Sequence, residues 1–441
     1  MKQDKRKDGR VIITSGRSLM ALAAAHSLGK RGIDIIGADC IQPTLLGFSK
    51  FVRKNESYAN FEEKEEKFLD NLEAIIRKYK PEDDRPYVLM PVFKETIVIA
   101  KHKERFKDLI TIATPDFDAI SKVHPKKKLC ETAREYDVHI PDTWCISSMD
   151  DIERLKDELA YPLIIKPEDG TGGKGIEILQ DEEELRKMYK KNSKEFGPSQ
   201  LLQQMVKGED YCMTAMFQNG ELKASMAYKN IRRFPTDSGS GVIRETIDES
   251  RFVKHAKSIL EPLRWNGVVQ LDFIWDENPA SEPYLIEINP RFFGGLFQSV
   301  QSGIDYPWLN YLLHVTGKLP ESEKAIQGTK TKIPLAWILA IIDESINFKE
   351  HYQILAEAGK EAMEEMKRNG LKEAFISFKE RMKERKELKM KKKEQLLQVL
   401  QDAKLAENEV FTRDDPFVAM GFLYALSYLL KYGKLPPEMD M

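Results

Sequence analysis

Short apolar runs alternate with helix-prone segments over the first 120 residues. Residues 11–14 form a buried-strand pattern, 19–30 favour a helix and 34–38 favour a second strand. The alternation continues with a helix at 62–79, a strand at 87–91, a helix at 95–107 and a strand near 111–113. Strands that alternate with helices predict a parallel sheet, so we expect residues 1–120 to form a doubly wound α/β domain.

The turn after the first strand contains a single glycine, Gly16. Dinucleotide-binding domains of this class need three glycines in that turn, for a tight bend and a close approach to the pyrophosphate. We therefore expect the domain to act as a scaffold or as a wall of a substrate site.

The pattern changes after residue 120. A helix, a strand, a glycine-rich loop, a strand, a helix and two hairpins follow as far as about residue 320, which predicts an α+β domain. Residues 321–441 are predicted to be a mainly helical extension. It contains a charged run at 379–393 with nine basic and three acidic residues, which we interpret as a solvated helix face, the alternative being a patch for RNA or membrane.

Composition narrows the classes of partner. Sixty-nine Lys and Arg against 71 Asp and Glu give a formal charge of -2, so no global field attracts nucleic acid or an anionic membrane. The four cysteines are dispersed without zinc-ligand spacing, which indicates a reducing compartment. Apolar runs are too short to span about 30 Å of hydrocarbon. We expect a soluble cytoplasmic protein without nucleic-acid or membrane partners, and homo-oligomerisation is left open.

A glycine-rich loop follows a strand that ends in Lys166. Residues 170–175 match GxGxxG, but the next residues, 176–179, alternate like a strand, and a helix begins only at the capping box of 181–184. A loop between two strands predicts a flap whose backbone N–H groups cover phosphate, assisted by the charges of Lys166 and Lys174. The alternative is an ordinary glycine-rich hairpin.

Polar residues recur at alternate positions of two further strands, at 268–275 and 284–291. Asp272 lies on the less apolar face of the first, and Glu287, Asn289 and Arg291 share one face of the second. If the strands pair, two carboxylates and an amide oxygen converge, and such hard ligands suit Mg²⁺. Arg291 can then stabilise a transferring phosphoryl group. The alternative is an amphipathic sheet with an exposed polar face. The opposite face of the second strand is expected to carry Tyr284, Ile286 and Ile288.

The order of these motifs resembles the ATP-grasp superfamily, especially its carboxylate-amine ligases and the ATP-grasp modules of carbamoyl-phosphate synthetase, over about residues 10–320. The resemblance implies a Rossmann-like pre-ATP-grasp domain at 1–120 and an ATP-grasp fold at 121–320, and these are followed by the helical C-terminal extension that the pattern predicts at 321–441. It implies ATP as cosubstrate, with Mg²⁺ or Mn²⁺. The implied nucleotide-binding residues are Lys126, Lys166, Gly172, Gly173, Gln204, Met205, Val206 and Asp210.

The resemblance also assigns the remaining roles. Asp272, Glu287 and Asn289 match the metal ligands, and Arg291 with Lys166 the catalytic residues. Spacing from the turn near residue 140 selects Lys126 over Lys127 and Lys128. Three positions depart from the family pattern, namely Pro125 before the first lysine, Asp137 at a usual glycine and Gln204 at a usual acid.

Two arginines in the region after the hairpin are candidates for substrate binding. Arg233 and Arg244 lie in a stretch that lines the substrate pocket in the resembling ligases, and arginine binds a carboxylate through two parallel hydrogen bonds. Their alternative is a plain surface position.

The resemblance implies an ATP-dependent, ADP-forming carbon-nitrogen ligase that activates a small-molecule carboxylic acid as an acyl phosphate for attack by an amine. The alternatives are an enzyme of the carbamoyl-phosphate synthetase or biotin carboxylase type, a catalytically silent ATP-binding protein, and a kinase that phosphorylates a hydroxyl.

Overall fold

The computed structural model describes residues 8–168, 175–234, 240–321, 324–333, 397–409 and 414–421, together with seven single residues between 360 and 394. By its internal contacts the chain divides into two compact units. The first comprises residues 1–229, 245–329 and 409–441, and the second comprises residues 230–244 and 330–408.

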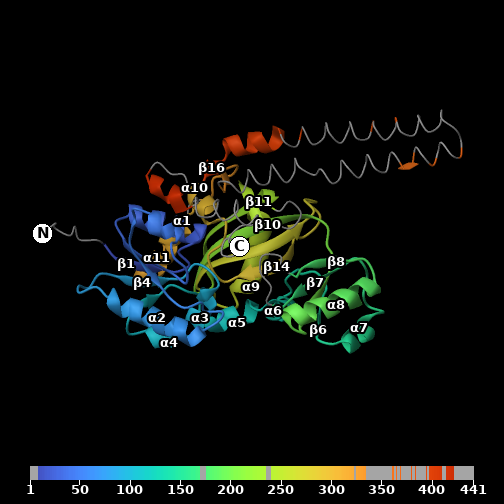
Figure 1. The fold of residues 1–441 in the computed structure, drawn as a ribbon, viewed down its shortest axis with the longest axis horizontal. Coiled ribbons are helices and arrows are strands. Elements are labelled where there is room, and N and C mark those ends of the chain that lie inside the picture. Colours follow the sequence, from blue (N-terminus) through green and yellow to red (C-terminus); the bar gives the residue numbers. More distant parts are fainter. Residues whose placement is uncertain are drawn as a thin grey trace. The chain divides into compact units, whose positions relative to one another are not determined.

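A five-stranded parallel sheet forms the N-terminal part of the first unit (Figure 1). Its order is β3-β2-β1-β4-β5, so β1 and β4 are neighbours at the point where the winding reverses direction. The predicted doubly wound domain is thereby confirmed. The strands are β1 (Arg10–Ile13), β2 (Asp34–Asp39), β3 (Val52–Ser57), β4 (Tyr87–Met90) and β5 (Thr111–Ile112).

Helices cover this sheet on both faces. Apolar residues of β1, β2 and β4 share one core with α2 (Glu65–Lys78), α3 (Glu95–Lys101) and α4 (Lys103–Phe106). The predicted helix 95–107 is broken at His102, whose φ of -104° and ψ of 23° leave the helical region. On the other face, α1 (Leu19–Lys30) begins at Ser18, whose side chain accepts a hydrogen bond from the Ala21 N–H.

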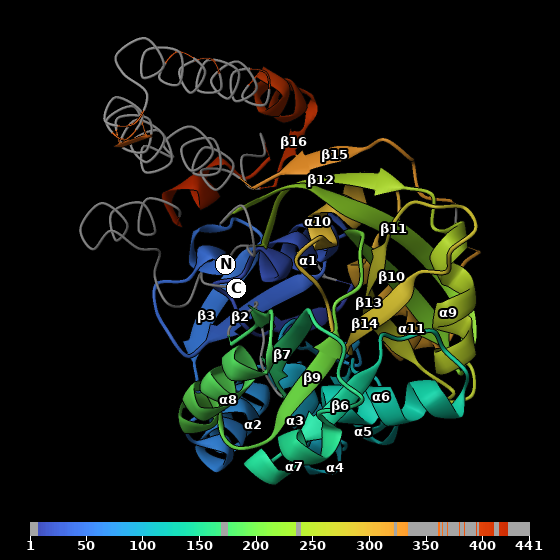
Figure 2. The ribbon, with the colours of Figure 1, turned by 90° about the vertical axis from the view of Figure 1, so that its right-hand side faces the viewer.

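A second, antiparallel sheet has the order β6-β9-β7-β8 (Figure 2). The pairing of β7 with β8 confirms that the glycine-rich loop connects two strands. The strands are β6 (Thr143–Ile146), β7 (Leu163–Pro167), β8 (Glu177–Leu179) and β9 (Gln200–Gln204). The helices of this region are α5 (Phe117–Val123), α6 (Lys126–Glu135), α7 (Met149–Leu155) and α8 (Glu182–Phe196).

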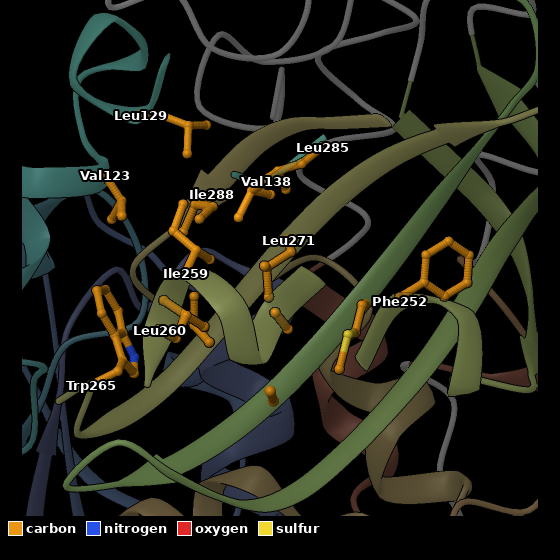
Figure 3. Packing of buried hydrophobic residues seen from close by; sticks show 14 of the residues in the cluster. Val123, Leu129, Val138, Phe252, Ile259, Leu260, Trp265, Leu271, Leu285 and Ile288 are labelled. Atoms are coloured by element: carbon orange, nitrogen blue, oxygen red, sulfur yellow. The ribbon is translucent and has the colours of Figure 1, made fainter. Parts of the chain in front are cut away.

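The largest sheet of the first unit is antiparallel, and its order begins β14-β13-β10-β11. The Asn219-Gly220 turn between β10 and β11 has φ of 52° and 90°, as a type I′ hairpin needs. Figure 3 shows the core beneath this sheet, where Trp265 and Leu271 have no exposed surface. The elements are β10 (Glu209–Gln218), β11 (Glu221–Phe234), β12 (Ser240–Ile247), α9 (Ser250–Leu260), β13 (Gly267–Trp275) and β14 (Tyr284–Asn289).

One predicted feature of β14 is wrong. Strict alternation places Ile286 with Ile288, but the register shifts between Asp272 and Phe273 of β13, because Asp272 pairs with Glu287 whereas Phe273 pairs with Leu285. The bulge turns Leu285 into the core beside Ile288 and leaves Ile286 half-buried.

Two helices and a C-terminal segment complete the first unit beside α1. The Ser27 hydroxyl on α1 donates to Asp305 at 2.6 Å, and His26 Nε2 lies 2.9 Å from Asp415 Oδ2. The helices are α10 (Leu296–Gln301) and α11 (Tyr306–Thr316).

The second unit has a small core of its own. Val242 and Ile243 pack against Val399, Ala403 and Ala406. Its strands β15 (Lys330–Lys332) and β16 (Glu407–Asn408) are parallel neighbours.

Most of the predicted helical extension, including all of the charged run 379–393 except Lys379 and Lys383, lies outside the described residues. No helix in the described part of the chain combines the length and hydropathy that crossing a bilayer requires. The boundaries at residues 120 and 320 stay predictions.

Candidate active site

Lys166 lies at the end of β7 with only 7% of its surface exposed. Its Nζ donates to Gln203 Oε1 at 2.9 Å, and the Gln203 amide donates to Thr143 Oγ1 at 2.9 Å. Burial, reinforced by the nearby positive charge of Lys126, lowers the pKa of Lys166 to about 8. The ammonium is therefore fixed in direction by neighbouring strands and poorly solvated, so an anionic group is a strong partner for it.

Lys126 is the first residue of α6, directly after Pro125. Its Nζ donates to Glu287 Oε1 on β14 at 2.8 Å, and 11% of the lysine side chain is exposed. Of the three adjacent lysines, Lys126 is thus the one that reaches the predicted metal strand. Lys128 instead pairs with Glu131 on the helix surface.

The predicted pairing of the two carboxylate-bearing strands is confirmed. Asp272 lies opposite Glu287, and Gln270 lies opposite Asn289. Asp272 accepts from the Gln270 amide at 2.8 Å and from the Asn289 amide at 3.1 Å. Desolvation, followed by the charge of Glu287, raises the pKa of Asp272 to about 7. The carboxylates of Asp272 and Glu287 are therefore close enough for their negative charges to repel each other.

Arg291 completes this group of side chains. Its guanidinium donates to Asn289 Oδ1 at 2.9 Å and lies over the ring of Phe93, 4.7 Å from the centroid. Desolvation lowers the pKa of Arg291, while the charges of Glu287 and Asp272 oppose that change. The cation is thus held beside the carboxylate pair by a flat aromatic support from the N-terminal sheet domain.

The donor set fits a hard divalent cation. Asp272, Glu287 and Asn289 offer carboxylate and amide oxygens, and a bound cation would offset both causes of the raised pKa of Asp272, which are burial first and then the charge of Glu287. The described residues contain no cluster of three or more His, Cys, Asp and Glu side chains suited to a metal. The amide of Asn289, and oxygens from a bound phosphate, would complete the coordination.

The predicted adenine hinge follows β9. Gln204 and Val206 are half-buried and Met205 is 38% exposed, which leaves an apolar side chain accessible at the hinge. Asp210 is half-buried on β10, where it pairs with Ile274. Their roles in nucleotide binding stay predictions.

Asp137, at the usual glycine, has a φ of 53°. Aspartate adopts this left-handed conformation more readily than most residues, which explains how the departure is accommodated.

For four further predicted residues the assigned roles stay predictions. Gly172 and Gly173 lie outside the described residues. Arg233, which is half-buried, and Arg244, which is buried, belong to the second unit, and their substrate role stays a prediction.

Three contributing residues were not assigned from the sequence. Gln270 lies two positions before Asp272 on the same strand, so alternation puts both on one face and Gln270 could have been proposed as its donor. Gln203 on β9 lies opposite Thr143 on β6, which only the strand pairing reveals. Phe93 lies about 200 positions before Arg291 in the chain, and no local pattern indicates that contact.

Comparisons with known proteins agree with this geometry. Residues 123–295 match the family described as "ATP-grasp domain". The carbamoyl phosphate synthase large chain of Clostridium acetobutylicum is 23% identical over 233 residues, covering 51% of this chain and 21% of that protein. Biotin carboxylase 1 of Bacillus subtilis is 29% identical over 202 residues, covering 41% of this chain and 43% of that protein.

The fold has a solved counterpart as well. N5-carboxyaminoimidazole synthetase from Staphylococcus aureus, complexed with ADP, superposes with a TM-score of 0.60 at 17% identity, covering 78% of this chain and 87% of that one. The matches to both curated relatives span less than half of their length. Together with the paired carboxylate strands and the lysines Lys126 and Lys166, these matches identify an ATP-grasp domain at residues 123–295 of this chain.

Proposed function

We propose that this protein is an ADP-forming, ATP-dependent carbon-nitrogen ligase. The observation that carries the proposal is the convergence of Lys126, Asp272, Glu287 and Arg291 in one network of charges. Two facing carboxylates beside two cations suit the transfer of a phosphoryl group between anionic oxygens.

The side chains divide the work by position. Lys126 and Lys166 would contact the phosphate oxygens of ATP, and Arg291 would hold the substrate carboxylate in line with the γ-phosphoryl group. Asp272, Glu287 and Asn289 would hold Mg²⁺, which supplies neutralisation of phosphate charge when bound. Phosphoryl transfer depends mainly on positioning and charge neutralisation, so the proposed reaction needs no protein nucleophile.

The proposed sequence has two steps. The substrate carboxylate attacks the γ-phosphorus, the bond to the β-phosphate oxygen breaks, and ADP and an acyl phosphate form. An amine then attacks the acyl carbon, and inorganic phosphate leaves with the electron pair of the carbon-oxygen bond.

A second candidate reaction follows from the relatives. Carbamoyl phosphate synthase and biotin carboxylase are the named relatives, so bicarbonate is an alternative acceptor of the phosphoryl group. A silent ATP-binding protein is disfavoured by the complete set of oxygen ligands, and a kinase would leave a stable phosphorylated alcohol.

Product analysis tests the proposal. The full chain is incubated with Mg-ATP, hydroxylamine and a panel of amino acids and dicarboxylic acids, and the nucleotides are separated by chromatography. We expect a hydroxamate together with ADP and phosphate. AMP and pyrophosphate would contradict the mechanism, and stimulation by bicarbonate alone would favour the carboxylase-type reaction.

A further inference from the structure

The carboxyl ends of three strands of the N-terminal sheet meet around Glu95. Thr14 follows β1, Tyr58 follows β3, and residues 91–95 follow β4. Since β1 and β4 are neighbours where the winding reverses, this edge is the crevice in which doubly wound domains bind their ligands. The described site residues of the ATP-grasp domain do not include any group from this edge except the support that Phe93 gives to Arg291.

Glu95 is fully buried at this edge, with 0% of its surface exposed. One carboxylate oxygen, Oε1, accepts from the Thr14 hydroxyl and from the N–H groups of Val92 and Phe93, the latter two at 3.3 and 3.2 Å. The other oxygen, Oε2, has no hydrogen-bond partner among the described residues. A buried carboxylate oxygen without a donor is costly, so it calls for a donor that the described residues do not supply.

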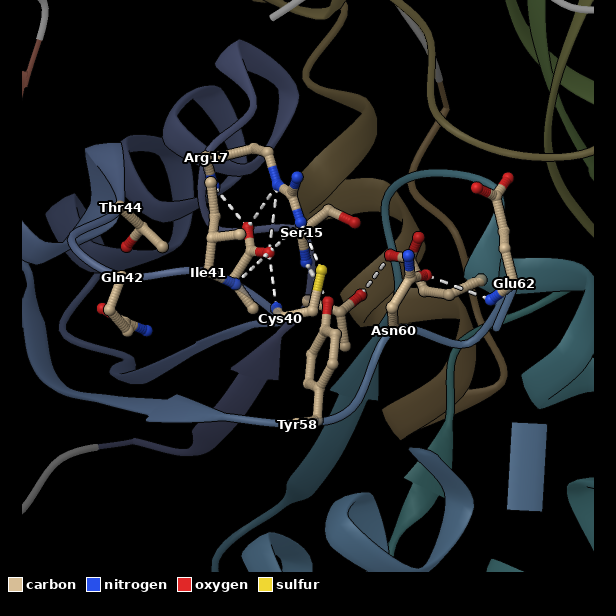
Figure 4. A network of polar contacts seen from close by, with 12 residues as sticks. Ser15, Arg17, Cys40, Ile41, Gln42, Thr44, Tyr58, Asn60 and Glu62 are labelled. Carbon is tan, nitrogen blue, oxygen red and sulfur yellow. Dashed lines mark hydrogen bonds and ion pairs between the residues drawn. The ribbon is translucent and has the colours of Figure 1, made fainter. Parts of the chain in front are cut away.

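A second buried carboxylate at the same edge has hydrogen-bond donors for both of its oxygens. Asp39, also with 0% exposure, accepts through Oδ2 from the Arg17 N–H at 2.9 Å and through Oδ1 from the Cys40 N–H at 2.6 Å (Figure 4). The Arg17 guanidinium also binds it. Both oxygens of Asp39 therefore have donors, whereas Glu95 keeps one oxygen without a donor.

The surroundings of Glu95 connect it to the reaction centre. The charge of Glu95 acts on Arg291, and burial together with the charges of Glu95 and Asp39 raises the pKa of Tyr58. The Tyr58 hydroxyl accepts from the Ser15 N–H at 3.0 Å (Figure 4). An anionic group is thus placed close to the arginine that would hold the acyl group, on the side supplied by the N-terminal sheet.

We propose that Glu95 is the receptor and general base for the amine substrate, with Oε2 accepting a hydrogen bond from its ammonium group. The inference rests on the proposed ligase function and deepens it. It specifies a nucleophile that arrives as a cation, and it gives the N-terminal sheet a direct part in the second step.

The chemistry moves two protons. Oε2 takes the first from the ammonium, and the freed nitrogen lone pair attacks the acyl carbon to form the carbon-nitrogen bond. The carbon-oxygen bond to phosphate then breaks, and the leaving phosphate takes the second proton from the nitrogen, which gives the amide. The proton later passes from Glu95 to solvent. Because the side chain is enclosed, its surroundings have to open for the amine to enter.

Hydroxylamine separates this role from all earlier steps, since it is largely unprotonated at neutral pH and needs neither an ammonium receptor nor a base. Glu95→Gln should lower kcat/KM for amide formation by about 10²-fold or more. Hydroxamate formation and the KM for ATP should stay near their wild-type values. The amine probes are ammonium chloride and the standard amino acids, each with the acid selected by ADP release.

Thr96→Val is the matched control, because Thr96 is equally buried and its hydroxyl also lacks a partner among the described atoms. It should leave both products unchanged. Glu95→Asp, which keeps the carboxylate, should retain part of the rate of amide formation. If Glu95→Gln does not fold, the ratio of amide to hydroxamate formation is measured in Glu95→Asp instead. Equal losses of amide and hydroxamate, or no loss of either, would overturn the role of Glu95. A wild-type protein that forms no hydroxamate would instead refute the proposed ligase function, and this inference with it.

Discussion

The ammonium group of Lys166 is buried, and burial disfavours its charged form. Its pKa falls from 10.5 to about 8 on folding, so the unfolded chain binds more protons than the folded chain between those two pH values. Stability should therefore rise with pH across this window, and the full cost of the buried ammonium is present at pH 7. A cation retained at such a cost indicates a functional demand.

Lys166→Met should expose that cost. The apolar side chain removes the buried charge, so we expect the free energy of unfolding at pH 7 to increase by about 1–3 kcal/mol while binding of an ATP analogue weakens. Urea titration and calorimetry measure the two effects. The stability gain should shrink as the pH rises from 8 toward 10.5, whereas Lys191→Met, at an exposed position, should show no such trend. An unchanged stability would mean that Lys166 is not held charged.

Glu287→Gln should abolish most catalysis without unfolding the protein. The amide keeps the shape and an acceptor for Lys126, but it loses the charge proposed to hold Mg²⁺, so Mg-dependent ATP turnover should fall by about 10²-fold or more. Glu282→Gln, which alters a half-exposed carboxylate paired with His255, is the matched control and should keep near-normal turnover. Near-normal turnover in Glu287→Gln would exclude the metal role.

Alternation along the two strands, with the assumption that the strands pair, was enough to place Asp272, Glu287, Asn289 and Arg291 together. It succeeded because one face of each strand is committed to the core, which fixes the other face. It did not reveal Glu95, since a buried acid in the first turn of α3 looks like an ordinary helix-start residue. Partners that depend on the approach of separate elements leave no local pattern.

At the scale of elements, the bulge in β14 reverses which of two neighbouring residues, Leu285 or Ile286, should contribute more to stability. Leu285 has 1% exposure and lies in the core, whereas Ile286 is half-buried. Leu285→Ala should lower the free energy of unfolding by about 2–5 kcal/mol. Ile286→Ala should lower it by much less, because less of its surface is buried on folding. Chemical denaturation of the two variants measures the difference, and the reverse order would mean that the strand has no bulge.

Elements with strong apolar patterns were predicted well, and those without were not. The buried strands β1, β2 and β4 lie within a residue or two of their predicted ranges. The edge strand β3, with the sequence VRKNES, was not predicted, since its polar side chains are exposed or half-exposed and it is defined by backbone pairing with β2.

At the scale of the whole molecule, residues near the C-terminus stabilise the N-terminal domain. Asp415 is fully buried, accepts from the Ser49 hydroxyl and the Lys50 N–H, and contacts His26. Asp415→Asn should lower the free energy of unfolding by about 1–3 kcal/mol, because it disrupts a buried polar network. Asp414→Asn, at an adjacent exposed position, should have little effect in the same urea titration. Equal effects would show that the contact contributes no stability.

Such long-range contacts mark the limit of prediction from the sequence. The alternation of strands and helices predicted an N-terminal domain, but it assigned all residues after 320 to one extension. The described residues 414–421 belong to the same compact unit as the N-terminal sheet. A short segment that packs through a few buried residues, such as Asp415 and Val418, is too short to show a periodic pattern.

The ion pair between Lys126 and Glu287 joins the head of α6 to the metal strand at 2.8 Å. A divalent cation at Glu287 competes with the lysine for the same carboxylate and so frees the ammonium for phosphate. A phosphate that attracts the lysine likewise frees the carboxylate for the cation. Each ligand therefore raises the affinity for the other, and thermodynamic reciprocity makes the two enhancements equal. This coupling through one salt bridge favours binding of the metal and the nucleotide together over binding of either alone.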